Sequence, residues 1–174
     1  MGEAALAERV HRPTEYKTFS RKLAPSLNIL GGALAIAGGL GVWVRATELA
    51  QEGLAPVEVA SHMGYAEQAG IVIAAVGAAL MLASITWLLR FRILKLLPLL
   101  ASLGLAVLVG SQLPRIDTSA AALAEQAREN IDFVAFHAGY GWGAWCMLAG
   151  AILAVLGSLA GLLRELDVRK GIPG

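Results

Sequence analysis

Hydrophobic residues in this chain gather in four long runs, separated by segments that hold most of the charged residues. The runs extend from about Leu27 to Val44, from Ala69 to Leu89, from Ile93 to Leu113 and from about Gly139 to Leu163. A helix needs about 20 mainly apolar residues to cross roughly 30 Å of hydrocarbon. All four runs are near that length, so the pattern predicts four membrane-spanning helices.

Four buried helices of a soluble bundle are the alternative explanation. The surface helices of a soluble bundle carry a polar face, but no charged residue lies on any face of Gly70–Trp87 or Gly139–Leu163. The chain is 57% hydrophobic and 16% charged, whereas soluble domains average about 45–50% and about 25%. We therefore expect an all-α fold, a four-helix transmembrane bundle in contact with the lipid bilayer.

Lysine and arginine are unevenly distributed around the predicted helices. Eleven of the 14 lie before the first helix, between the second and third, or after the fourth, and three lie in the other two loops. These residues accumulate on the cytoplasmic side of membrane proteins. Residues 1–24 are therefore predicted to be a cytoplasmic segment, 25–164 the transmembrane domain and 165–174 a cytoplasmic tail. Arginine outnumbers lysine ten to four, a usage common in high-GC bacteria, so we place the protein in a bacterial inner (plasma) membrane.

The two longer loops are acidic and are predicted to face outward. Their charges are either ordinary solvated loop surface or a surface presented to a partner. In the second loop Asp117, Thr118 or Ser119 can cap a helix from about Ala120 to Phe133. We therefore predict a short extracytoplasmic helix in that loop.

The chain also reads as two copies of one helical hairpin, about 25–90 and about 93–164. In each copy an arginine ends the first helix, a His-x-Gly-Tyr motif opens the second, and Leu-Leu-Arg ends it. Both copies begin on the cytoplasmic side, so they are predicted to be parallel repeats. The recurring residues are Arg45, His62 and Tyr65 in the first copy and Arg115, His137 and Tyr140 in the second.

The two histidines are candidate ligands. A His and a Tyr three residues apart lie on one face of a helix, so two inward faces would bring His62 and His137 together at the outer end of the bundle. Two imidazoles can share a divalent metal or a haem, or form a pH-sensitive pair. The alternative is that the histidines, with Tyr65 and Tyr140, belong to the aromatic belt at the membrane–water interface.

Two arginines are predicted to lie at the same depth. Arg45 and Arg115 would neutralise Glu67 and Asp132, or hold an anionic group beside the histidine pair. No metal ligand set is defined by the spacing of these residues, and the cofactor, if any, stays open.

Small residues recur at spacings of four along each predicted helix. Membrane helices associate through such residues, because lipid supplies no hydrophobic drive for packing. A compact bundle explains the pattern, and so does an oligomer or a partner helix. The packing candidates that we single out are Gly31, Gly39, Gly150, Gly157 and Gly161.

Recognisable catalytic motifs are missing. The single cysteine, Cys146, allows no intramolecular disulfide. A net charge of +1 does not indicate a surface that binds nucleic acid. We therefore expect a non-catalytic membrane subunit or scaffold that presents its acidic outer loops to a membrane protein partner or to a second copy. The alternatives are a metal- or haem-binding protein using the histidine pair and, third, a small transporter.

A family resemblance rests on the first and last helices. The first is rich in Gly and Ala and closes on Trp43-Val44, and the last contains the run Leu148–Gly157. In these features the chain resembles small four-helix membrane proteins of actinobacteria and similar bacteria, of the tryptophan-operon-associated type. The resemblance implies the four-helix fold and no activity.

Overall fold

The structure is a computed structural model that describes residues 13–48, 58–88, 96–130 and 136–169. Within these residues, four helices are long and apolar enough to cross a membrane, which confirms the predicted number of spans and indicates a multi-pass membrane protein in contact with lipid. In chain order the elements are α2 (Pro13–Leu40), β1 (Val42–Glu48), β2 (Glu58–Met63), the 3-10 turn η1 (Gly64–Ala66), α3 (Gln68–Leu88), α4 (Leu97–Asn130), β3 (Phe136–Tyr140) and α5 (Trp142–Arg169).

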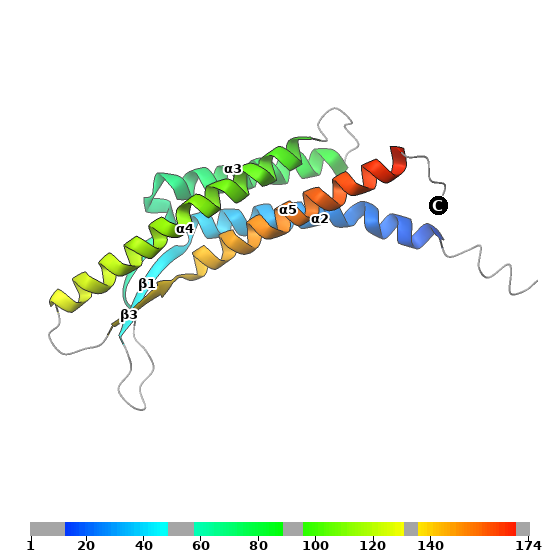
Figure 1. Ribbon diagram of the computed structural model, residues 1–174. Helices are drawn as coiled ribbons and strands as arrows, with labels where there is room; N and C mark the ends of the chain where they lie inside the picture. The colour runs from blue at the N-terminus through cyan, green and yellow to red at the C-terminus, as the bar shows by residue number, and fades with distance from the viewer. Residues whose placement is uncertain (1–12, 49–57, 89–95, 131–135, 170–174) are drawn as a thin grey trace, which may run out of the picture.

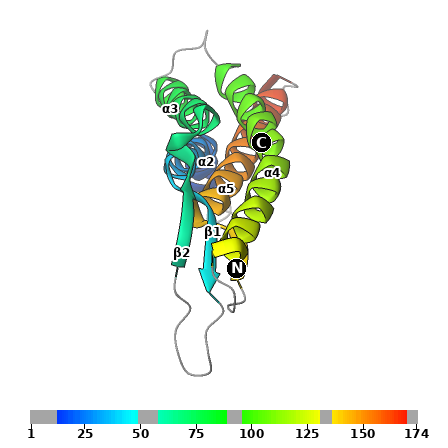
Figure 2. The ribbon, with the colours of Figure 1, turned by 90° about the vertical axis from the view of Figure 1, so that its left-hand side faces the viewer.

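The helices run side by side along one long axis (Figure 1). Helix α2 packs most extensively, against α5 and α3, and α4 contacts the same two helices. Figure 2 looks toward the end of the bundle from which β1 and β2 extend. We call this the sheet end. The described start of α2, the end of α3, the start of α4 and the end of α5 all lie at the opposite end.

Glycines allow α2 to approach its two neighbours closely. A Cβ atom added to Gly31 would lie 2.7 Å from the carbonyl oxygen of Gly150 in α5, and one added to Gly39 would lie 2.6 Å from that of Gly70 in α3. No side chain fits at either crossing, so the helix backbones are in direct contact, as is common in membrane proteins. Two more close backbone contacts of α2 lie seven residues away along the helix. There Gly38 packs against Gly143 of α5, and Gly32 packs against Gly77 of α3.

A few polar side chains are enclosed by the bundle away from the sheet end. Asn28 is 0% exposed and packs against Gly157 of α5. The Ser158 hydroxyl lies 3.1 Å from the carbonyl oxygen of Pro98, to which it donates, and 3.4 Å from Asn28 Oδ1. One turn further along α5, Gly161 packs against the ring of Trp87.

The prediction of an all-α fold is wrong at the sheet end. A three-stranded sheet lies there, and α2 ends at Leu40 rather than at Val44. The apolar run that we interpreted as the end of the first helix continues as Val42-Trp43-Val44. Its β-branched and aromatic residues favour a strand, and hydropathy alone does not separate a helix from a strand here.

The third predicted span and the short helix predicted in the second outer loop are one helix. We predicted a span ending at Leu113 and a separate helix from about Ala120, but α4 runs without interruption through Pro114 to Asn130. Pro114 removes one helical hydrogen bond. The cost is offset because Ile116 is buried in the core and Leu123 packs against it.

Both His-x-Gly-Tyr motifs were wrongly placed at helix starts. His62 lies in β2 and Tyr65 in the 3-10 turn, whereas His137 and Tyr140 both lie in β3. Helices α3 and α5 begin only afterwards, at Gln68 and Trp142. Arg45 and Arg115 do not end helices either, since Arg45 lies in β1 and Arg115 within α4.

Helix α4 is much longer than a bilayer requires. Its 34 residues extend about 50 Å at 1.5 Å per residue, against roughly 30 Å of hydrocarbon. Its last turns continue alongside β1 and β3 (Figure 1). The fold therefore consists of a four-helix bundle with a small module at the sheet end, formed by the three strands and the last part of α4.

Candidate functional site at the sheet end

The sheet has the order β2-β1-β3, with both pairs antiparallel. Val44 in the central strand is paired with His62 on one side and with Tyr140 on the other. Directly paired residues of antiparallel strands lie on the same face of a sheet. These three residues therefore form a row on one face, and Val44 at its centre is buried.

Helix α4 is fixed to this row by a hydrogen bond. The Tyr140 hydroxyl donates to Asp117 Oδ1 over a short distance. This hydrogen bond, with smaller contributions from burial and from the negative charge of Asp117, raises the pKa of Tyr140 above its usual value of 10.0. The Tyr140 ring also packs edge-to-face on Trp145, with 5.8 Å between the ring centroids. Tyr140 thus connects the sheet to α4 and to the first turns of α5.

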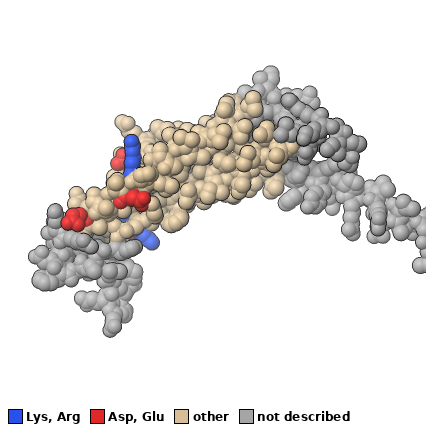
Figure 3. All heavy atoms as spheres, in the orientation of Figure 1, with Lys and Arg blue, Asp and Glu red and all other residues tan. Residues whose placement is uncertain are grey.

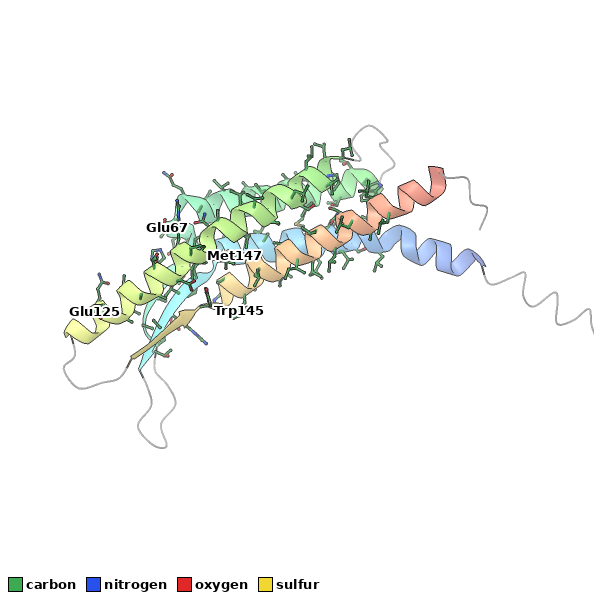
Figure 4. The ribbon with its side chains drawn as sticks, viewed as in Figure 1. Glu67, Glu125, Trp145 and Met147 are labelled. Atoms are coloured by element: carbon green, nitrogen blue, oxygen red, sulfur yellow. The ribbon has the colours of Figure 1, made fainter. Side chains whose placement is uncertain are left out.

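His62, at the other end of the row, faces an acidic residue. Its Nε2 atom lies 3.1 Å from Glu67 Oε1, within hydrogen-bond distance and close enough for an ion pair when the imidazole is protonated. Glu67 is the residue before α3, and both side chains remain about half exposed. Figure 4 shows Glu67 at the start of α3 and Glu125 near the far end of α4, so carboxylates lie both beside the module and at its far end.

A pocket of about 240 Å³ opens between the row and α4. Its apolar lining residues come from β1 and α4, and its polar ones come from β2, α4 and Glu67, the residue before α3. Its lining residues are Trp43, Val44, His62, Glu67, Gln112, Arg115, Ile116, Thr118 and Ser119.

Trp43 lines this pocket and connects the sheet to the bundle. Its indole Nε1 donates a hydrogen bond of 2.8 Å to the carbonyl oxygen of Gly38 in α2. The residue is an extra one in β1, because Val42 and Val44 pair with Met63 and His62 in β2. Such a bulge locally redirects a side chain, and here the indole points into the top of the bundle, where it is buried.

The two arginines of the repeat lie on different sides of the sheet. Arg115 lines the pocket with Glu67 and His62. Arg45 is exposed between the buried residues Val44 and Ala46. Successive residues of a strand point to opposite faces, so Arg45 lies on the face away from α4. Asp132, the expected partner of an arginine, lies outside the described residues.

The sheet does not bring the two histidines together. His62 pairs with Val44 and His137 pairs with Thr47, on opposite edges of β1. Across the sheet, the backbones of His62 and His137 are two strand spacings apart, or about 10 Å. Along the strands they are three residues apart, also about 10 Å, so the direct separation is about 14 Å. Among the residues that the structure describes, no group of three or more His, Cys, Asp or Glu side chains is arranged to hold a metal ion.

Charged side chains are confined to the sheet end within the part of the chain whose side chains are described. Figure 3 shows blue and red atoms only there, while the rest of the described surface is tan. The acidic residues outnumber the basic ones: Glu58, Glu67, Asp117 and Glu125 against Arg45 and Arg115.

Several pocket residues were not singled out from the sequence. Thr118 and Ser119 were interpreted as helix caps, although they lie one turn after Arg115 within α4. Gln112 is only 7% exposed. Gln112 could have been found in the sequence as a lone amide at the end of an apolar run. It lies three residues before Arg115, so the two side chains share a helix face.

No protein-family model matches this chain, and no curated protein matches its sequence. The resemblance to tryptophan-operon-associated membrane proteins therefore stays a prediction, and the function is argued from the geometry of the sheet end.

Proposed function

We propose that this chain is a non-catalytic membrane subunit or scaffold that presents the module at its sheet end, on the outer side of the membrane, to a protein partner. The proposal is carried by one observation, which is that the last part of α4 is fixed to the sheet through Tyr140 and Asp117. A fixed surface binds a partner without a large loss of conformational entropy.

The charge distribution supports this role. The described charges of the module are mostly acidic and exposed, with Glu58 on β2 and Glu125 on α4. Complementary charges steer association and select partners, so we expect a partner with a basic contact surface. A second copy of the chain would have to meet these carboxylates with its own basic side chains, of which Arg45 and Arg115 are described at the sheet end.

The orientation rests on the lysines and arginines. Eleven of the 14 precede α2 or lie in its first part, connect α3 to α4, or belong to the end of α5 and the residues after it. The described ends of these helices lie away from the sheet. The preference of Lys and Arg for the cytoplasmic side then puts the sheet end outside, in keeping with the proposed role.

Site-specific photo-crosslinking in intact membranes tests the proposal. A photoreactive residue at Ser61 in β2 or at Glu125 in α4, both exposed, should give a protein adduct of one defined mass. An adduct at twice the chain mass identifies a second copy, and any other defined mass identifies a different protein.

Val107 is the matched control, because it is 72% exposed on α4 but lies in the apolar part of that helix. A photoreactive residue there should give lipid adducts only. The proposal fails if neither sheet-end position yields a protein adduct, or if Val107 yields the same adducts as they do.

A further inference from the structure

The pocket at the sheet end has the chemistry of a zwitterion site. On α4, Arg115 and Ser119 lie four residues apart and therefore on one helix face, and both supply hydrogen-bond donors to the pocket. Thr118 donates its own hydroxyl to the Arg115 carbonyl oxygen at 2.9 Å, so its oxygen remains an acceptor. Glu67 contributes a carboxylate from the start of α3.

The pocket is also of headgroup size. Sites that enclose drug-sized molecules occupy roughly 300–1,000 Å³, and the volume here is about 240 Å³. A guanidinium suits a phosphate, since its planar fork donates two parallel hydrogen bonds. A carboxylate suits a primary ammonium, which has three N–H donors.

Exposed apolar residues lie further along α3 and α4. Ile71 follows Glu67 by four residues, one turn along α3, and is 56% exposed. Val107 precedes Arg115 by eight residues, about two turns along α4, and is also exposed. Both helices are candidate membrane spans. A ligand with its polar part in the pocket would therefore have its apolar part against α3 and α4, where lipid chains lie.

We propose that this pocket binds the headgroup of a phospholipid that carries a phosphate and a primary ammonium, as phosphatidylethanolamine does. Arg115 and Ser119 bind the phosphate, Glu67 binds the ammonium, and the acyl chains lie against Ile71 and Val107. The pocket belongs to the same module as the proposed partner surface, but lipid binding and crosslinking are separate measurements, so either proposal can fail alone.

Native mass spectrometry of the full chain in detergent tests this inference. The protein is mixed with equal amounts of phosphatidylethanolamine, phosphatidylcholine and phosphatidylglycerol of identical acyl chains. We expect the ethanolamine lipid to bind best, because choline has no N–H donor for Glu67 and glycerol has no positive charge. Loss of a charge-assisted hydrogen bond should weaken binding about tenfold in Arg115→Gln.

Two further variants separate the site from general charge effects. Arg45→Gln removes an exposed arginine from the other face of the sheet and should bind lipid as the unmodified protein does. Glu67→Gln should abolish the preference for ethanolamine over choline while phosphate binding persists.

Equal binding of the three lipids, or equal losses in Arg115→Gln and Arg45→Gln, would overturn the inference. A parallel binding experiment with soluble phosphoethanolamine, which has no acyl chains, distinguishes a lipid ligand from a free solute. If the soluble compound binds as tightly as the lipid, the exposed apolar residues of α3 and α4 contribute nothing and the assignment to a lipid is wrong.

Discussion

The hydroxyl of Tyr140 in β3 donates a hydrogen bond to the carboxylate of Asp117 in α4. The two residues lie 23 positions apart in the sequence, and their hydrogen bond connects the sheet to α4. In the same part of α4, Ile116 is buried in the core and Leu123 packs against it.

Removal of this hydrogen bond should loosen the module and leave the bundle intact. In Tyr140→Phe we expect amide hydrogens of α4 after Asp117 to exchange several-fold faster, because local opening becomes easier. Those between Leu97 and Val109 should be unchanged. Tyr65→Phe is the control, since Tyr65 is exposed in the 3-10 turn. Equal exchange in both variants would show that the hydrogen bond does not fix α4.

The raised pKa of Tyr140 gives a second test. The hydrogen bond stabilises the neutral phenol, so its contribution to stability is present below pH 10.0, the usual pKa. It is lost as the pH rises through the higher pKa of the folded protein. A tyrosinate absorbance titration, with Tyr140→Phe subtracted, should show Tyr140 ionising at lower pH in Asp117→Asn. No change on this substitution would contradict the assigned cause.

Glycine contacts between helices should be sensitive to a single methyl group. In Gly31→Ala the new Cβ would lie 2.7 Å from the Gly150 carbonyl oxygen. Overpacking of this kind destabilises by about 1–3 kcal/mol, and it should lower the melting temperature in detergent.

Gly104→Ala is the matched control for this packing test. A Cβ there would have no heavy atom within 4 Å, and removal of a glycine from a helix interior stabilises by roughly 0.5–1 kcal/mol. If both variants melt at the same temperature, the contact between α2 and α5 is not as close as the backbone geometry indicates.

The number of spans could be predicted from the sequence because hydropathy reports helix length and burial in lipid directly. Helices α3 and α5 begin within a few residues of the predictions, at Gln68 and Trp142. The sheet could not be predicted in the same way. Its strands are five to seven residues long, and their pairing depends on contacts between segments far apart in the chain.

The repeat shows how a sequence pattern can be informative about position and wrong about geometry. The motifs that contain His62 and His137 do both lie at the sheet end, next to the same central strand. A helical period was assumed for them, so the predicted faces were wrong. His62 and Arg115, two of the candidates, line one pocket, whereas Arg45 lies on the other face. Which face each residue occupies depends on strand alternation and on the bulge at Trp43.

The orientation of the sheet end is tested most directly by thiol labelling in intact cells. Cys146, the single cysteine, is first replaced by alanine, and one cysteine is then introduced at Ser61 in β2 or at Leu96 beside the start of α4. Both positions are exposed and lie at opposite ends of the bundle. A membrane-impermeant maleimide should label Ser61→Cys in intact cells and Leu96→Cys only after permeabilisation. Labelling of Leu96→Cys in intact cells, with Ser61→Cys protected until permeabilisation, would contradict an outward-facing module and with it the proposed function.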